Sequence, residues 1–216
     1  MNYLLIAATV KEIEPFLAFY KKFDKELSVD FLIAGIGLTT TAYRLTKQLQ
    51  LKKYDFVLQA GVAGCFNSKI PLGTVLAVKK DTIADQSVIE LKKLKTLFDL
   101  KLVPQNQFPF NKGWLANPNK LLFEKIKVKS VTGISVNEIS TSKQKINFYK
   151  TTFNPVLESM EGAALHFVCL MEKTPFMQIR SVSNYIGERN KNNWDMKKSI
   201  ENLNETLIRF FKATKN

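Results

Sequence analysis

Short apolar runs alternate along the chain with segments in which apolar residues recur at helical spacing. The apolar runs have the length of β-strands and lie at residues 2–9, 30–37, 55–64, 74–84, 128–136 and 174–184, with a shorter extended segment at 155–159. The segments between them predict helices at residues 11–23, 39–51, 160–172 and 197–215. This alternation predicts an α/β layered fold with a largely parallel central sheet.

Residues 85–120 follow neither period. They contain Pro104, Pro109 and Pro118, and we expect them to form an irregular flap or a contact between subunits. No repeat, low-complexity tract or linker interrupts the chain, so residues 1–216 are interpreted as a single domain.

Glycine and amide residues follow several of the predicted strands. In parallel sheets, ligands bind at the carboxyl ends of the strands. The pattern therefore predicts a small-molecule site at that edge of the sheet, formed by residues from these positions: Gly35, Gly37, Gly61, Gly64, Asn137 and Asn184.

The composition is that of an ordinary globular protein, with 45% hydrophobic and 24% charged residues. No apolar run approaches the ~18 residues of a membrane helix, so we expect no membrane partner. The first residues lack a basic leader and a small-residue cleavage site, and we expect a cytoplasmic protein.

The net charge of +13 raises the alternative of a nucleic-acid-binding module. Most of the basic residues are lysines, they are dispersed, and no helix-turn-helix or RNA-recognition signature accompanies them. We therefore expect a solvated basic surface and no nucleic-acid partner. A positive field would also attract an anionic small substrate.

The chain has too few cysteines and histidines for a disulfide framework or a dedicated zinc site. Cys65, Cys169 and the single histidine, His166, all lie in apolar contexts and are interpreted as buried residues. There is no zinc-ligand spacing, no G-x-S-x-G elbow, no P-loop, and only G-x-G of the dinucleotide fingerprint. We expect neither a metal nor a cofactor.

Four segments together resemble one enzyme family. The sequence SMEGAA (159–164) precedes an apolar helix and then a strand ending in RSVSN (180–184). AATVKEIEPF (7–16), AGIGLTTTA (34–42) and AGVAGCF (60–66) precede it in the family's order. The chain is similar in these segments to the purine nucleoside phosphorylase and methylthioadenosine nucleosidase family. The resemblance implies a three-layer α/β/α nucleosidase domain with a mixed, largely parallel sheet, a small nucleoside substrate, no cofactor, and a homodimer or higher homo-oligomer.

The resemblance also implies roles for individual residues. Glu12 would be the base that activates water, Glu161 would bind the ribose hydroxyls, and Met160 would pack on the ribose face. Arg180, a charge within an apolar strand, requires a partner, and Glu12 and the water site are the expected ones. From the pattern alone, both glutamates also fit acids in the first turn of a helix, favoured by the helix dipole.

Asn184 stands where the family's adenine-specific nucleosidases carry aspartate. An ionised aspartate would repel the O6 of a 6-oxopurine, whereas the asparagine NH₂ donates to N7 or O6. We therefore expect a 6-oxopurine, although asparagine also pairs with adenine. Residues 183–204 are most similar to family members that release hypoxanthine, and Ser183 is expected to orient Asn184.

Further contacts follow from the same resemblance. Backbone near Ile139 and Ser140 would meet the other purine edge, and Gly64 would allow backbone to approach the ribose and water. Val62 replaces a serine found in many of the nucleosidases, which removes one expected ligand of the water.

The 5′ side of the substrate would end in an aryl carboxylate. Arg189 and Trp194 are the candidates to receive it. Phe108 and Phe110, in the irregular region, are candidates for a contact with a neighbouring subunit.

Three activities remain open within the family. Phosphorolysis is disfavoured because the chain has only four arginines and Glu12 would repel phosphate. Hydrolysis of a hypoxanthine nucleoside is favoured, with a methylthioadenosine/S-adenosylhomocysteine nucleosidase and a purine nucleoside phosphorylase as alternatives.

Overall fold

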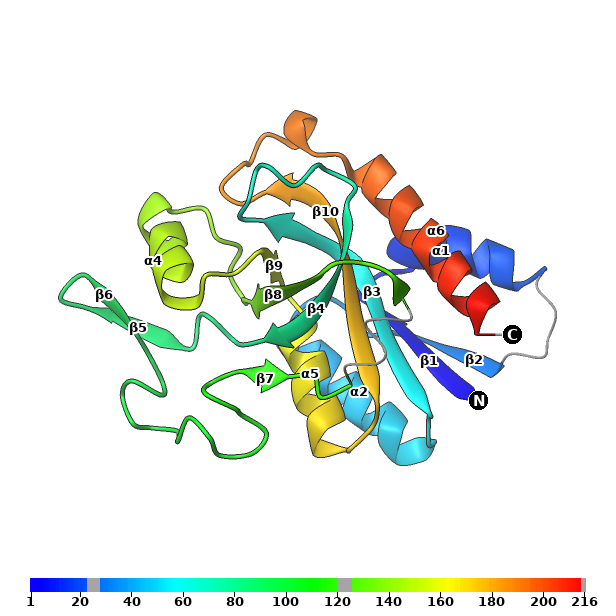
Figure 1. Cartoon of the computed structure of the whole chain (residues 1–216), viewed down its shortest axis with the longest axis horizontal. Coiled ribbons are helices and arrows are strands. Elements are labelled where there is room, and N and C mark those ends of the chain that lie inside the picture. The colour runs from blue at the N-terminus through cyan, green and yellow to red at the C-terminus, as the bar shows by residue number, and fades with distance from the viewer. Residues whose placement is uncertain (23–27, 120–125, 215–216) are drawn as a thin grey trace.

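The first strand, β1 (Asn2–Ala7), lies between two layers of helices in the computed structural model, which describes residues 1–22, 28–119 and 126–214. Tyr3, Leu5 and Ala7 pack in one core with α1 (Val10–Tyr20) and α6 (Met196–Ala213), while Leu4 and Ile6 pack in another with α2 (Leu38–Leu51) and α5 (Gly162–Met171). Successive strand residues point to opposite faces. Helices therefore cover both faces (Figure 1), and the predicted three-layer α/β/α fold is confirmed.

The central sheet is mixed and largely parallel, as predicted. Its strands run in the order β10-β4-β8-β9-β3-β1-β2, and β7 pairs with β4. The remaining bounds are Ser28–Ile33 (β2), Phe56–Cys65 (β3), Val75–Asp81 (β4), Leu115–Ala116 (β7), Ser130–Ser135 (β8), Leu157–Ser159 (β9) and Phe176–Tyr185 (β10). β3 also pairs with β10, which closes five of these strands into a ring that the sequence pattern does not predict.

Several elements differ from the predicted ones. The region 85–120 is not wholly irregular, because it contains the antiparallel hairpin of β5 (Ser87–Glu90) and β6 (Lys93–Thr96) as well as β7. Helix α4 (Lys143–Phe153) and the short 3₁₀ helix η1 (Lys191–Asn193) are additional elements. The predicted ends of two helices, at residues 23 and 215, lie outside the described residues.

The two phenylalanines of the irregular region occupy different environments. Phe110 packs against Phe98 and Phe167 of its own chain, with ring centroids 5.1 and 6.4 Å away. Phe108 is 61% exposed.

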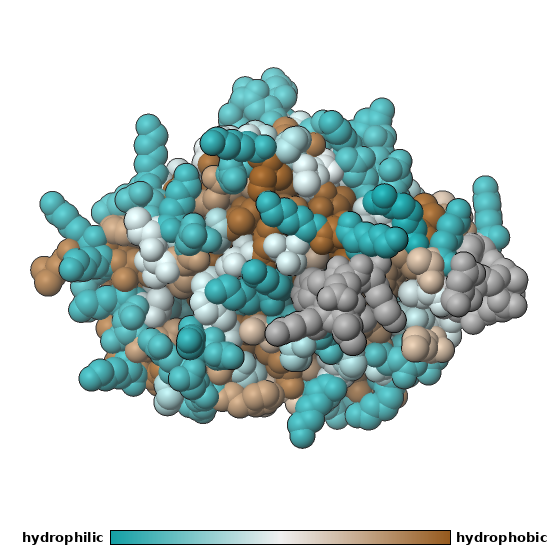
Figure 2. Space-filling model, in the orientation of Figure 1, coloured by the Kyte–Doolittle hydropathy of each residue, from teal (hydrophilic) through white to brown (hydrophobic). Residues whose placement is uncertain are grey.

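Hydrophilic residues are spread over the face of the molecule seen in Figure 2, with a smaller hydrophobic area among them. Within the part of the chain that the structure describes, no helix combines the length and apolarity needed to cross a membrane.

Candidate active site

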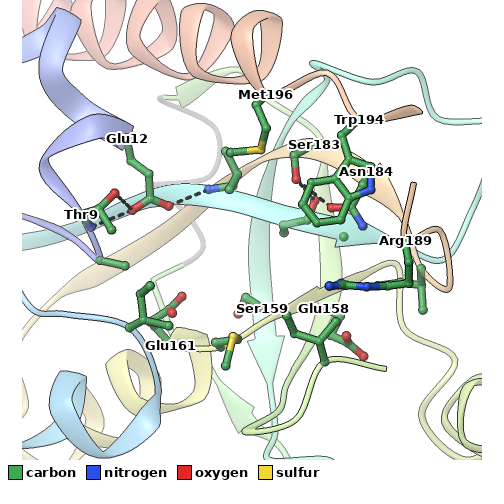
Figure 3. A pocket seen from close by; sticks show the side chains of 18 residues that line it. Thr9, Glu12, Glu158, Ser159, Glu161, Ser183, Asn184, Arg189, Trp194 and Met196 are labelled. Carbon is green, nitrogen blue, oxygen red and sulfur yellow. Dashed lines mark hydrogen bonds between the residues drawn. The ribbon is translucent and has the colours of Figure 1, made fainter. Parts of the chain in front are cut away.

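A cleft with a cavity volume of about 280 Å³ opens at the carboxyl ends of the parallel strands β1, β3 and β10. Figure 3 shows the side chains that surround it, with Glu12 and Glu161 toward one end and Asn184 toward the other. Nine residues singled out from the sequence line this cleft: Glu12, Gly64, Ile139, Met160, Glu161, Ser183, Asn184, Arg189 and Trp194. Arg180 and Ser140 lie behind its walls and do not line it.

Glu12 lies in the first turn of α1, and its side chain bridges three backbone or hydroxyl groups. Its Oε2 accepts from the backbone N–H of Thr9 at 2.9 Å and lies 3.2 Å from the Thr9 hydroxyl, while Oε1 accepts from the backbone N–H of Val62 at 3.2 Å. Burial raises the pKa of Glu12, although the positive charge of Arg180 and these N–H donors oppose the rise. A carboxylate with a raised pKa is suited to accept a proton near neutral pH.

The backbone that carries Glu12 is held by the C-terminal helix. Asn204, buried on α6, accepts a hydrogen bond from the N–H of Phe16 at 2.9 Å and donates to the carbonyl of Glu12 at 2.9 Å. Pro15 lies inside α1 and has no backbone N–H, so the regular hydrogen bonding of this helix is interrupted at that residue. The sequence pattern did not single out Asn204, because the Glu12 carbonyl that it binds is 192 positions away.

Glu161 is the N-cap of α5, not a residue of its first turn as predicted, since the helix begins at Gly162. Its side chain makes no capping bond and turns to the cleft. Oε1 accepts from the N–H of Gly37 at 3.2 Å, and Oε2 lies 3.3 Å from Nη1 of Arg180. Gly37 adopts a φ of 99°, a conformation that favours glycine, so the turn after β2 presents its N–H to the carboxylate.

Arg180 is 1% exposed and takes part in a buried polar network. Its Nη2 donates to Oε1 of Gln59 at 2.8 Å, and its Nε donates to Gln178 at 3.1 Å in the amide orientation that satisfies the neighbours of Gln178. In that orientation Gln178 also donates to Asp81 at 3.2 Å and to His166 at 3.1 Å. Burial raises the pKa of Asp81 to about 7 and lowers the pKa of His166 to about 4.

The ion pair of Arg180 therefore differs from the expected one. Its recorded carboxylate partner is Glu161, not Glu12. Glu12 and Arg180 both approach the open side of Gly61, where a Cβ would lie 2.9 Å from Oε1 of Glu12 and would collide with Nη1 of Arg180. The guanidinium thus acts on Glu12 through its field and on Glu161 through direct contact.

Asn184 is aimed by an irregularity in the sheet. The register of β10 against β3 shifts between Val182 and Asn184, which leaves Ser183 in a bulge. Such bulges redirect side chains. The Ser183 hydroxyl donates to Oδ1 of Asn184 at 2.9 Å, and Nδ2 lies 3.2 Å from the carbonyl of Tyr185. These two hydrogen bonds fix the orientation of the amide, with Oδ1 toward the Ser183 hydroxyl and Nδ2 toward the Tyr185 carbonyl.

Arg189 and Trp194 form a wall on the same side of the cleft as Asn184 (Figure 3). The Arg189 guanidinium lies 5.5 Å from the centroid of the Trp194 ring, and the indole N–H donates to the carbonyl of Glu188 at 3.2 Å. Together they present an aromatic face and a cation.

Glu158 is a polar residue of the cleft that the sequence interpretation did not select. It is 5% exposed, and Ser140 donates to both of its carboxylate oxygens, through its backbone N–H and its hydroxyl. Ser140 thus supports a cleft residue, while Ile139 is part of the cleft wall.

The interpretation of Cys65, Cys169 and His166 as buried residues is confirmed. His166 Nδ1 lies 2.8 Å from the carbonyl of Leu115, so the imidazole is tied into the core behind the cleft.

The chain belongs to the phosphorylase superfamily, whose family model matches residues 7–215. The resemblance found in the four sequence segments is therefore confirmed for the family as a whole.

Two relatives represent the particular enzymes to which the chain is similar. It is 27% identical over 162 residues to the 5′-methylthioadenosine/S-adenosylhomocysteine nucleosidase of Buchnera aphidicola, a match covering 74% of this chain and 67% of the relative. It is 25% identical over 207 residues to the futalosine hydrolase of Thermus thermophilus, covering 94% of this chain and 90% of the relative.

Solved structures have the same fold. A futalosine hydrolase mutant of Helicobacter pylori superposes with a TM-score of 0.82 at 19% identity, covering 99% of this chain and all of that one. The 5′-methylthioadenosine/S-adenosylhomocysteine nucleosidase of the same organism, bound to butyl-thio-DADMe-Immucillin-A, superposes with a TM-score of 0.81 at 20% identity, covering 99% of each chain.

Proposed function

We propose that this protein hydrolyses the N-glycosidic bond of futalosine and releases hypoxanthine, a step of menaquinone biosynthesis by the futalosine pathway. The observation that carries the proposal is the arrangement of Glu12, Glu161 and Asn184 in one cleft (Figure 3). Two carboxylates lie at one end, where a ribose would develop positive charge, and a fixed amide lies toward the other, where a purine would leave.

The reaction requires a water, an anionic setting and a hydrogen-bond donor to the leaving base. Glu12 takes a proton from the water that attacks C1′, the bond from C1′ to N9 breaks, and the departing base gains a proton from solvent. Glu161 accepts hydrogen bonds from the ribose hydroxyls, Met160 packs on the ribose, and Asn184 donates to N7 or O6. Proton transfer by a positioned base contributes about 10²–10⁴-fold, and charges aimed at the transition state add to it.

In this proposal the attacking water is positioned by the carboxylate of Glu12 and by backbone near Gly64. Val62 has no hydroxyl to bind water, but its N–H holds Oε1 of Glu12. The close approach at Gly61 leaves no room for a side chain between the carboxylate and Arg180. Glu12 at the nucleophile position favours neutral water over phosphate, because a second anion there would be repelled.

The aryl carboxylate on the 5′ side of futalosine provides the reason for assigning Arg189 and Trp194 to substrate binding. The guanidinium would pair with the carboxylate and the indole face would pack on the ring. We also propose a cytoplasmic homodimer, for which the exposed Phe108 is a candidate contact. Sedimentation of the purified chain would measure its oligomeric state.

A second candidate is hydrolysis of methylthioadenosine or S-adenosylhomocysteine. It is supported by the similarity to 5′-methylthioadenosine/S-adenosylhomocysteine nucleosidases, of which the Buchnera aphidicola enzyme is 27% identical over 162 residues. Asn184 counts against it, because adenine-specific members of the resembled family carry aspartate there.

The test is base release by the purified protein in phosphate-free buffer, with futalosine, inosine and methylthioadenosine in parallel. Hypoxanthine from futalosine would support the proposal. Adenine from methylthioadenosine would support the second candidate, and strict dependence on added phosphate would identify a phosphorylase. No base from any substrate would refute a nucleosidase acting on these compounds.

A further inference from the structure

Asn184 and Glu158 lie on opposite sides of the same glycine. Gly64 of β3 is paired with Asn184 of β10 on one side and with Glu158 of β9 on the other. Strands are spaced by about 4.8 Å, so the Cα atoms of Asn184 and Glu158 lie about 10 Å apart across the sheet. Both line the cleft, and Figure 3 shows them on facing sides of it.

The space between them is bounded by apolar atoms. The Ile186 side chain lies against Gly64, where a Cβ would collide with its Cδ1, and it also lines the cleft. A flat ring with one polar group at each edge would meet an amide on one side and a carboxylate on the other.

The carboxylate of Glu158 accepts two hydrogen bonds from Ser140. The Ser140 backbone N–H, which can only donate, bonds to Oε1 at 3.1 Å, and the Ser140 hydroxyl donates to Oε2. Each carboxylate oxygen can accept a second bond. Burial raises the pKa of Glu158, while the two Ser140 donors and Lys145 act in the opposite direction and Asp85 adds to the rise.

The edge of a purine that faces such a carboxylate must carry a donor. Hypoxanthine and other 6-oxopurines carry hydrogen on N1, whereas N1 of adenine is an acceptor that would face the carboxylate oxygens without a bond. We propose that Glu158 is a specificity-determining residue whose carboxylate accepts the N1–H of a 6-oxopurine bound over Gly64, opposite Asn184. This inference rests on the purine site proposed above, and it gives the base selectivity a second origin independent of Asn184.

Binding of free bases to the purified protein tests the inference without requiring turnover. Calorimetric titration with hypoxanthine, 1-methylhypoxanthine and adenine compares an N1 donor, a blocked N1 and an N1 acceptor. A hydrogen bond to a charged group corresponds to roughly 10–100-fold in affinity. The wild type should bind hypoxanthine more tightly than either other base by about that factor.

Glu158→Gln should reduce the preference for hypoxanthine over adenine about tenfold or more, because the amide introduces a donor and removes the charge. Glu138→Gln is the matched control, since Glu138 lies on the neighbouring loop, is exposed, and pairs with Lys145 outside the cleft. It should leave the preference within twofold. Ser140→Ala removes the hydroxyl bond to Oε2 of Glu158 and should therefore reduce the preference in the same direction, by a smaller factor.

Equal affinity of the wild type for hypoxanthine and 1-methylhypoxanthine would overturn the inference, as would a Glu158→Gln variant with unchanged base preference. Tighter binding of adenine than of hypoxanthine by the wild type would also overturn it, since the carboxyl would then be a donor. If futalosine is hydrolysed while the free bases show no discrimination at N1, the inference fails and the proposed function stands. If no purine base binds, the inference fails, and the separate turnover assay decides the proposed function.

Discussion

The Oε2 atom of Glu161 lies 3.3 Å from Nη1 of Arg180, and this ion pair joins the N-cap of α5 to the interior of β10. Both side chains are almost completely buried. Gly37 supplies a further donor to Glu161, and Gln59 a further acceptor to Arg180. The carboxylate assigned to the ribose is therefore held directly by two other segments of the chain, through Arg180 and Gly37, and indirectly by a third, through Gln59.

Removing the cation should destabilise the fold. Arg180→Gln would leave Glu161 buried without its counter-ion, and we expect the free energy of unfolding to fall by about 3–5 kcal/mol in urea denaturation. Arg209→Gln is the control, because Arg209 is exposed and its recorded side-chain hydrogen bond is to Thr206 on the same helix; its effect should stay within about 0.5 kcal/mol. A loss below about 1 kcal/mol for Arg180→Gln would contradict the assigned pairing.

Glu12→Gln should lower kcat/KM for base release by about 10²–10⁴-fold, because an amide cannot take the proton of the attacking water. Thermal unfolding of the variant should stay close to that of the wild type. The control is Glu14→Gln on the exposed side of the same helix, which should keep wild-type activity. Activity of Glu12→Gln within fivefold of the wild type would exclude Glu12 as the base.

The pH profile should report the ionisation of Glu12. Since burial raises the pKa of Glu12 and the base must be ionised, kcat/KM should fall as the pH is lowered through a value above the ordinary 4.5 and level off at higher pH. Steady-state rates between pH 4.5 and 8 would measure this limb, with unfolding followed over the same range. A flat profile across that range would mean that a different group controls the reaction.

Asn184→Asp should shift the choice of base. At neutral pH an ionised aspartate would repel O6 of hypoxanthine, so hypoxanthine release should fall by at least about tenfold while adenine release gains relative to it. Parallel assays with futalosine and methylthioadenosine measure the ratio. Asn192→Asp, at an exposed position of the 3₁₀ helix η1, provides the control for the added charge. An unchanged ratio in Asn184→Asp would place the selectivity elsewhere in the cleft.

Asp81 should make stability depend on pH. Burial raises its pKa from 3.8 to about 7 in the folded chain, so the folded state holds a proton that the unfolded state releases. This contribution to stability is complete below pH 3.8 and is lost as the pH rises to about 7. Relative to Asp81→Asn, the wild type should therefore lose roughly 3–4 kcal/mol between pH 4 and pH 8 in urea denaturation. A constant difference between the two proteins would show that Asp81 is ionised throughout.

The sequence by itself determined the class of fold, because the periods of strands and helices are local properties of neighbouring residues. The continuous apolar run at β1 predicted a strand, and the burial of both its faces followed from the helices around it. The same local reasoning missed α4, whose start is marked by Ser142: its side chain accepts from the N–H of Lys145. A single polar N-cap before a segment with few apolar residues indicates a helix much more weakly than a continuous apolar run indicates a buried strand.

The sequence also identified nine of the eighteen residues that line the cleft. Glu12, Glu161 and Asn184 follow or end predicted elements, and the order of parallel strands brings such ends to one edge of the sheet. Their motifs were sufficient to indicate the family to which the chain belongs.

Only the tertiary structure decided which residues are partners. Arg180 pairs with Glu161, although Arg180 and Glu12 both approach the open side of Gly61. Glu158 faces Asn184 only because β9 pairs with β3 in the ring of strands. Contacts of this kind depend on strand order and register, which are properties of the whole sheet and leave no periodic trace in the residues themselves.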